Sequence, residues 1–220
     1  MTTIEGIQAY SQWFGRPDAE VEADLAAFTR LLLKWNATQN LVSRETEADA
    51  WRRHVLDSLQ VLPLIGHLAE RGRPRRVLDV GSGGGLPALP LAIAAKGALW
   101  QFTLVEPIGK KVAFLRTVIR ELQLPAEVRA TRLAENDSRE TPGFDAITSR
   151  ALAPLPQLLG LIAPRFGPET VAVLHKGRDH AVELSESRLA WEFDVVIQPS
   201  ATDDRGVLLR ITNLRARSGS

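Results

Sequence analysis

The stretch VLDVGSGGGLP, from Val77 to Pro87, decides the fold class of this chain. An apolar run that contains one carboxylate, Asp79, is followed by four glycines within five positions. Glycine costs about 0.5–1 kcal/mol relative to alanine in a regular element, so such a cluster indicates a turn that needs positive φ or a close approach to the backbone. The pattern predicts a strand, a tight loop and the start of a helix, in that order.

From Arg75 onward, short β-rich runs alternate with helical ones, which is typical of βαβ units and a parallel sheet with helices on both faces. The predicted strands are RVLDV, FTLVE, AEVRAT, FDAITS and TVAVLH, and the predicted helices are PALPLAIAAK, GKKVAFLRTVIREL and PLPQLLGLIA. Two further strands, FDVVIQ and VLLRIT, are joined only by the turn-like PSATDDRG. They predict an antiparallel pair at the edge of the sheet.

The first 65 residues have the pattern of helices. One helix is expected to start near Ala19 with Asp18 as its cap, and a second is expected over residues 47–62. We expect residues 1–70 to form an N-terminal helical cap and residues 71–220 to form a Rossmann-like domain, the two packing as a single structural unit.

Composition narrows the function classes. The 220 residues include no cysteine, which excludes disulfides, thiolate metal sites and a cysteine nucleophile. No apolar run reaches the roughly 20 residues of a membrane span, and the N-terminus lacks a signal-peptide pattern, so we expect a cytoplasmic protein with no membrane contact. A net charge of +1, from 27 basic and 26 acidic residues, does not indicate a general nucleic-acid binder, so any such role must come from local clusters.

The position of the glycine loop indicates what it binds. In open α/β sheets, ligands bind at the carboxyl ends of the strands, and a helix N-terminus there favours an anionic group. Glu106 follows about 20 residues later, at the end of the next predicted strand, where a carboxylate can accept bonds from both hydroxyls of a ribose. Together the loop and Glu106 predict an adenosine-containing cofactor.

Two registers of the loop fit different cofactors. Residues 83–88 match the dinucleotide pattern G-x-G-x-x-G/A, so a small NAD(P)-dependent oxidoreductase is one hypothesis. Residues 79–85 match the loop of class I methyltransferases, in which Asp79 would face the ammonium of S-adenosylmethionine and N–H groups around Gly81 its carboxylate. The antiparallel hairpin favours the second register. A small-molecule methyltransferase and a non-catalytic module that binds S-adenosylmethionine and RNA are further alternatives.

Motifs along most of the chain resemble one family, the bacterial small-subunit (16S) ribosomal RNA guanine-N7 methyltransferases, also called the glucose-inhibited division protein B family. The motifs, in order, are WNATQNL (35–41), RHVLDS (53–58), DVGSGGGLPALPL (79–91), LVEPIGKKVAFLR (104–116), ITSRALAPL (147–155) and LHKG (174–177). The glycine loop is generic to methyltransferases, whereas RHVLDS, GKKVAFLR and SRALA together are specific.

The resemblance implies a class I S-adenosylmethionine-dependent methyltransferase fold, with a mostly parallel seven-stranded sheet, helices on both faces, an antiparallel C-terminal strand and an N-terminal helical cap. It implies methyl transfer from S-adenosylmethionine to N7 of one guanine in small-subunit ribosomal RNA. The partner is then this RNA or the small ribosomal subunit, and we expect a monomer. N7 carries a lone pair and no proton, so the reaction needs alignment rather than a general base.

Carried over by position, the resemblance implies a set of cofactor-binding residues. With the loop interpretation above, these are Asp79, Gly81, Gly83, Leu86, Glu106, Ala134, Glu135 and Arg150. Arg150 is also the candidate catalytic residue. It is expected to orient the cofactor rather than to contact N7, because a cation close to N7 would oppose a positively charged product. Pairing of Arg150 with a local carboxylate is the structural alternative. Gly84, Ala88 and Glu106 replace residues that are frequent in the family.

Five basic residues are candidates for RNA binding: Arg53, His54, Lys110, Lys111 and Lys176. Arg53 and His54 share a predicted helix face with Asp57, which leaves open an intrahelical ion pair or a contact with phosphate or guanine. Lys110 and Lys111 open a predicted helix, where cations oppose the dipole, and this placement favours RNA phosphates. No histidine has a partner at metal-ligand spacing, so no metal site is expected.

Overall fold

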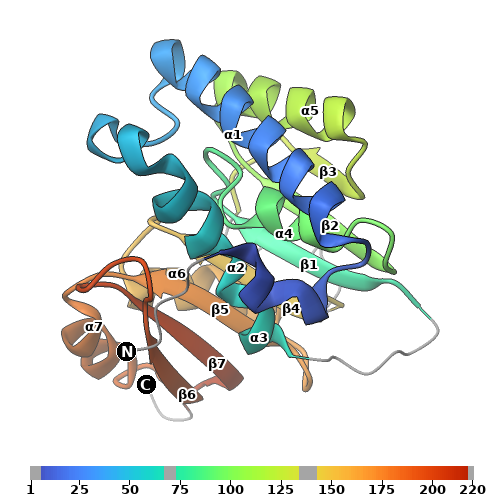
Figure 1. Ribbon diagram of the computed structural model, residues 1–220. Coiled ribbons are helices and arrows are strands. Elements are labelled where there is room, and N and C mark those ends of the chain that lie inside the picture. Colours follow the sequence, from blue (N-terminus) through green and yellow to red (C-terminus); the bar gives the residue numbers. More distant parts are fainter. Residues whose placement is uncertain (1–5, 67–72, 134–142, 218–220) are drawn as a thin grey trace.

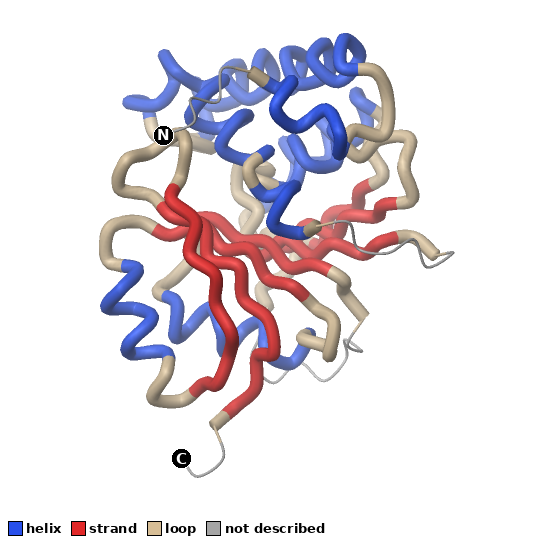
Figure 2. Tube along the Cα trace, turned by 60° about the horizontal axis from the view of Figure 1, so that its bottom comes forward, coloured by secondary structure: helices blue, strands red, loops and turns tan. Residues whose placement is uncertain are grey.

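The structure is a computed structural model that describes residues 6–66, 73–133 and 143–217, and the statements below concern these ranges. A seven-stranded sheet with strand order β3-β2-β1-β4-β5-β7-β6 lies at the centre of the molecule. Helices pack on both faces of this sheet (Figure 1, Figure 2). The predicted α/β architecture is therefore confirmed.

The parallel part of the sheet follows the predicted runs. Its strands are β1 (Arg75–Val80), β2 (Trp100–Val105), β3 (Ala126–Arg129), β4 (Ala146–Arg150) and β5 (Val171–Lys176). The helices between and after them are α4 (Ala88–Ala94), α5 (Gly109–Leu122), α6 (Leu155–Ile162) with a short η4 (Ala163–Arg165), and α7 (His180–Ser187). α7 was not predicted, because its sequence is polar and offers only a short apolar pattern.

The strand residues alternate between two cores, as expected when both faces of a sheet are covered. Val77 packs into a cluster with helices from the N-terminal part of the chain, α4 and α5. Its neighbour Leu78 packs into a second cluster with α6 and α7 on the opposite face. The same β1 strand thus supports both layers and ends at the glycine loop.

The C-terminal strands are β6 (Trp191–Pro199) and β7 (Val207–Ala216). They pair antiparallel, and β7 also pairs antiparallel with β5, with Lys176 opposite Val207. The predicted edge hairpin is confirmed. Because β7 is antiparallel to β5, the connection over residues 200–206 lies next to the carboxyl end of β5.

The N-terminal part of the chain is helical, as predicted, but its boundaries differ. The elements are η1 (Ile7–Trp13), α1 (Asp18–Gln39), η2 (Arg44–Asp49), η3 (Trp51–Leu56), α2 (Asp57–Leu59) and α3 (Val61–Ile65). Pro17 occupies the N-cap of α1, so the expected Asp18 cap is wrong. The single helix expected over residues 47–62 is a series of segments, and η3 is a π-helix that buries three consecutive residues, 54–56.

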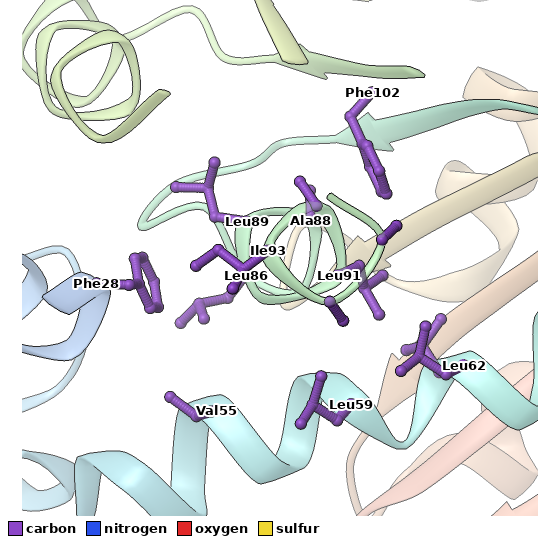
Figure 3. Close-up of a cluster of buried hydrophobic side chains, with 14 of the residues drawn as sticks. Phe28, Val55, Leu59, Leu62, Leu86, Ala88, Leu89, Leu91, Ile93 and Phe102 are labelled. Carbon is purple, nitrogen blue, oxygen red and sulfur yellow. The ribbon is translucent and has the colours of Figure 1, made fainter. Parts of the chain in front are cut away.

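The N-terminal helices and the sheet share one core. All seven residues of α4 are buried, and Figure 3 shows Phe28 of α1 and Val55 of η3 packed against this helix. A fully buried side chain of this size contributes about 1.5–3 kcal/mol, so the N-terminal helices stabilise the glycine-loop helix. The division of the chain near residue 70 stays a prediction. No helix within the described ranges is long and apolar enough to cross a membrane.

Candidate active site

The glycine loop joins β1 to α4 at the edge where the parallel strands end. Gly81, Gly83 and Gly85 have φ of +72°, +54° and +77°, a left-handed region that strains other residues. A Cβ at Gly81 would lie 2.5 Å from Leu152 Cδ1, and a Cβ at Gly85 would lie 2.2 Å from Leu89 Cδ1. Glycine is required here by backbone conformation and by the close approach of neighbouring side chains.

The N–H groups of this loop are largely used within the protein. Gly81 N and Ser82 N both donate to Val105 O, at 3.0 and 3.1 Å. Gly83 N donates to Glu106 Oε2 at 2.9 Å. The expectation that the N–H groups around Gly81 are free for an anion is therefore wrong, because the end of β2 and the carboxylate after it already accept them.

Glu106 follows β2 directly and is only 4% exposed. Its Oε1 accepts from Ile108 N at 2.9 Å, while Oε2 accepts from the glycine loop. The two bonds fix the carboxylate in one orientation at the mouth of the crevice. Each oxygen keeps a second lone pair, so the predicted contact with ribose hydroxyls is chemically compatible and stays a prediction.

Asp79 lies in β1 beside Thr148 of β4. Its Oδ1 accepts from Thr148 Oγ1 at 2.6 Å, whereas its Oδ2 is buried without a hydrogen-bond partner among the described residues. Burial raises the pKa of Asp79 to about 7, hydrogen bonds from Ser82 and Thr148 lower it, and the charge of Glu106 raises it. A buried carboxylate oxygen without a partner suits a cationic ligand group.

A cavity of about 380 Å³ lies beside the glycine loop, and we call it the cofactor cavity. Val80, Gly81, Val105, Leu133 and Leu152 are part of its lining. Its volume falls in the usual range for small-molecule sites, about 300–1,000 Å³. The residues present fit S-adenosylmethionine, because the cavity borders the glycine loop, and Asp79, which precedes the lining residue Val80, has a buried carboxylate oxygen without a hydrogen-bond partner among the described residues.

Of the described residues predicted to bind the cofactor, Gly81 lines this cavity, whereas Arg150 lines a second cavity and Asp79, Gly83, Leu86 and Glu106 are outside the lining of the first. Leu86 is 6% exposed and belongs to the core, where Figure 3 shows it between α4 and Phe28. The Leu86 side chain therefore packs in the core and does not face the cofactor cavity. Ala134 and Glu135 lie outside the described residues.

A second cavity, of about 460 Å³, lies next to the first, and we call it the charged cavity. Its charged lining comes from separate helices, strands and a connecting loop: Arg53, Asp57, Arg150, His175, Lys176, Glu183 and Asp203. Residues 152–154 line both cavities and form a shared wall. The preceding Ala151 has φ +53°, so the chain turns sharply as it leaves β4.

Arg150 is the last residue of β4 and is held from two sides. Its Nη1 lies 3.2 Å from Asp57 Oδ2, and its Nη2 lies 3.2 Å from Arg53 O and 3.1 Å from His54 Nδ1. Asp57 Oδ1 also accepts from Thr202 Oγ1 at 2.6 Å. Asp57 therefore pairs with Arg150 of the sheet rather than within its own helix, and this corrects the predicted intrahelical ion pair.

His54 is 2% exposed, which contradicts its predicted contact with RNA. Its Nε2 lies 2.9 Å from Thr46 Oγ1, and its Nδ1 faces Arg150 Nη2. Burial, followed by the charge of Arg150, lowers the pKa of His54 to about 4, so the ring is neutral and Nδ1 accepts. Both ring nitrogens are used inside the protein, and His54 positions Arg150.

Two other predicted RNA contacts are tied to nearby groups. Arg53 donates to Thr202 O at 2.7 Å and to Asp203 Oδ2 at 2.9 Å, which fastens η3 to the connection over residues 200–206. Lys176 donates to Ala153 O at 2.7 Å and pairs with Glu183 at 2.6 Å. The charge of Lys176 is thus balanced inside the protein, contrary to the expectation of a free cation, and the lysine holds the shared wall.

Lys110 and Lys111 lie in the first turn of α5, next to Glu106 in sequence. Lys110 is exposed and Lys111 half-buried, and neither forms an ion pair with another described residue. Both remain candidates for phosphate contacts.

Sequence reasoning missed His175 as a site residue, although it named the side chain. His175 Nε2 lies 3.3 Å from Asp57 O, in the charged cavity. The only signal was its place at the end of a predicted strand, beside the equivalent position of Arg150 on β4. Within the described ranges, no group of three or more histidine, aspartate or glutamate side chains has the arrangement of a metal site.

Comparison with solved structures places the fold among methyltransferases. A ribosomal protein L11 methylase from Lactobacillus delbrueckii subsp. bulgaricus has a TM-score of 0.54 at 15% identity, over 71% of this chain and 78% of that chain. An S-adenosylmethionine-dependent methyltransferase from Aquifex aeolicus has a TM-score of 0.53 at 15% identity, over 74% of this chain and 92% of that chain. At these identities the likeness concerns the fold alone.

Comparison of sequences is more specific. The chain is 44% identical to the ribosomal RNA small subunit methyltransferase G of Bartonella tribocorum over 90% of each chain, and 42% identical to that of Brucella ovis over 88% of each. The family model described as rRNA small subunit methyltransferase G matches residues 21–205. These residues include the shared wall and the lining of both cavities except Gly206 and Val207. The chain therefore belongs to the rRNA small subunit methyltransferase G family.

Proposed function

We propose that this protein transfers the methyl group of S-adenosylmethionine to N7 of one guanine in small-subunit (16S) ribosomal RNA. The observation that carries the proposal is the pairing of two cavities across one wall, residues 152–154. One cavity lies against the glycine loop at Gly81 and would take the cofactor, and the other would take a nucleobase. Membership of the family adds the RNA and the reaction class.

When bound, S-adenosylmethionine supplies an electrophilic methyl group on its sulfonium, and N7 supplies the lone pair that accepts it. Because N7 carries no proton, the protein does not need a general base. Its contribution is alignment of the two reactants, an effect that can lower a barrier by about 7–11 kcal/mol. Asp79 and Glu106 would hold the two ends of the cofactor, and Arg150, fixed by Asp57 and His54, lines the charged cavity that would take the base.

The partner is ribosomal RNA, and we propose that Lys110 and Lys111 contact its phosphates, joined by Arg53 through the part of its side chain that stays exposed beside Asp203. Lys110 and Lys111 lie in the first turn of α5, which follows the end of β2, and Arg53 lines the charged cavity. We further propose that the protein acts as a monomer in the cytoplasm, where its substrate is found, on the RNA or the small ribosomal subunit. The near-neutral net charge of +1 favours recognition by shape as much as by charge.

The test is radiolabelled methyl transfer to protein-free small-subunit RNA and to assembled small subunits, followed by mass-spectrometric mapping of the methylated base. One N7-methylguanine in small-subunit RNA is the expected product. Calorimetry should show micromolar binding of S-adenosylmethionine, and Gly83→Asp should abolish it. A protein that binds the cofactor but labels neither substrate would contradict the proposed reaction.

A further inference from the structure

Two buried polar atoms of residues lining the charged cavity lack a hydrogen-bond partner among the described residues, Arg150 Nη1 and His175 Nδ1. Arg150 Nη1 lies 3.2 Å from Asp57 Oδ2, so its charge is balanced, but the geometry makes no hydrogen bond. Buried polar groups without partners are rare and costly in native proteins. Two of them on residues of one cavity point to a ligand that supplies the missing partners.

The chemistry of each atom is defined by its surroundings. His175 Nε2 lies 3.3 Å from Asp57 O, and a carbonyl oxygen only accepts, so Nε2 carries the proton. Burial lowers the pKa of His175, which keeps the ring neutral and makes Nδ1 an acceptor. Arg150 Nη1 can only donate. The residues of the cavity therefore offer one donor and one acceptor.

We propose that Arg150 Nη1 and His175 Nδ1 recognise O6 and N1–H of the target guanine. This assignment rests on the proposed function. Guanine presents an acceptor, O6, beside a donor, N1–H, on its pairing edge. Adenine has an amino donor in place of O6 and an unprotonated N1 in place of N1–H. Its amino group would therefore face the Arg150 guanidinium, and its N1 would face the lone pair of His175 Nδ1. His175 is then a specificity-determining residue.

This orientation is compatible with reaction at N7. O6 lies between N1 and N7 at the rim of the purine, so a base held through O6 and N1–H can turn N7 toward the shared wall and the cofactor cavity. The guanidinium then contacts O6 rather than N7, and its charge is balanced by Asp57. The other oxygen of this carboxylate, Asp57 Oδ1, already accepts hydrogen bonds from Thr202 Oγ1 and Gln60 Nε2.

The test uses small-subunit RNA in which the target guanosine is replaced at that single site. Inosine keeps O6 and N1–H and lacks only the amino group, so its kcat/KM should stay close to that of guanosine. 2-Aminopurine riboside lacks O6 and has no proton on N1. Its kcat/KM should fall about 10- to 100-fold, the range expected for loss of a bidentate base contact.

The variants are His175→Ala and His175→Phe, the second of which fills the space of the ring without nitrogen atoms. Each should reduce the ratio of guanosine to 2-aminopurine activity by about tenfold. This ratio does not depend on the fraction of folded protein, because both RNAs are assayed on the same preparation. His180→Ala is the matched control, since His180 is outside the lining of the charged cavity and should keep the wild-type ratio.

An unchanged ratio in both His175 variants would overturn the assignment, and so would inosine as poor as 2-aminopurine riboside. If the wild-type protein methylates no RNA, the proposed function itself fails. The base preference is then decided by equilibrium binding of guanosine and adenosine monophosphates to the wild-type protein with S-adenosylhomocysteine. Equal affinity for the two nucleotides would overturn the inference, and a preference for guanosine lost in both His175 variants would support it.

Discussion

Glu106 Oε2 accepts a hydrogen bond of 2.9 Å from Gly83 N, which ties the end of β2 to the glycine loop after β1. The carboxylate expected to hold the ribose is thus fixed by the same loop that borders the cofactor cavity at Gly81. The loop and the carboxylate are held in place by each other, so a substitution in either should displace both.

Glu106→Gln should weaken cofactor binding. The amide can accept with only one of its two polar atoms, so either Gly83 N or Ile108 N loses its acceptor. Hydrogen bonds to charged groups contribute about 1.5–3 kcal/mol, so the Kd of S-adenosylhomocysteine measured by calorimetry should rise about 10- to 100-fold. Glu127→Gln on β3, with an exposed side chain, is the control, and equal Kd values for the two variants would contradict this role.

Stability should depend on pH through Asp79. Its folded-state pKa of about 7 lies above the ordinary 3.8, so the native state binds more protons than the unfolded state between these values. The contribution of the protonated carboxyl is fully present below the ordinary pKa and is lost as pH rises toward 7. Urea unfolding of wild type and Asp79→Asn across this window should show a steeper loss in wild type; parallel pH profiles would exclude the shift.

The affinity for S-adenosylhomocysteine should rise with pH over the range in which the stability falls. The ammonium of S-adenosylhomocysteine favours the ionised form of Asp79, so binding should strengthen as pH rises toward 7 and should release a proton. Calorimetry in buffers of different ionisation enthalpy measures this proton directly. Asp79→Asn should bind more weakly and release none, and proton release that persists in the variant would assign it to another group.

Gly81→Ala should impair both folding and binding. The residue has φ +72°, and a Cβ would lie 2.5 Å from Leu152 Cδ1 in the shared wall. Left-handed strain in a residue with a side chain costs about 1–3 kcal/mol, measurable by urea unfolding, and the displaced wall should abolish cofactor binding. Gly109→Ala is the matched control, since no atom lies within 4 Å of its Cβ position, and it should leave both properties unchanged.

Substitution of Asp57 should lower the free energy of unfolding more than substitution of a surface carboxylate does. Asp57→Ala leaves the largely buried Arg150 without its counter-charge, and breaking such a pair costs about 3–5 kcal/mol of unfolding free energy. Asp203→Ala removes a partly exposed pair with Arg53, for which about 0.2–1 kcal/mol is expected. Similar losses for the two variants would mean that the Asp57 pair is not a buried one in solution.

Lys110→Ala combined with Lys111→Ala should lower RNA affinity uniformly and reduce its salt dependence. Each phosphate contact contributes about 0.7–0.9 to the slope of log K against log salt, so the double variant should lose about 1.4–1.8. Arg215→Ala is the control, because Arg215 lies near the opposite end of the sheet. An unchanged slope in the double variant would place the RNA elsewhere.

Sequence patterns predicted the parts of the site that depend on local geometry. The glycine loop and Glu106 both follow strands that are recognisable from their own residues, and parallel strands end at the same edge of a sheet. The edge hairpin was predictable for the same reason, because a short turn-like segment joins two apolar runs. Local pattern and tertiary structure agree at these positions.

The charged cavity could not be predicted in this way. Asp57 lies on a predicted helix face with Arg53, whereas Arg150 lies at the end of a distant predicted strand. Nothing in the sequence selects Arg150 rather than Arg53 as the ion-pair partner of Asp57. The π-helical turn of η3 buries His54, which a regular helical pattern did not indicate. Ion pairs between the N-terminal helices and the sheet depend on how these helices pack. The spacing of residues along the chain does not predict that packing.

The wall formed by residues 152–154 belongs to both cavities, and this has a thermodynamic consequence. A ligand that shifts the wall from one side changes the free energy of binding on the other side. Linkage makes the effect reciprocal, so the factor by which the methyl donor alters affinity for the nucleobase equals the factor by which the nucleobase alters affinity for the donor. A ternary complex is then favoured or disfavoured as a whole, whichever ligand arrives first.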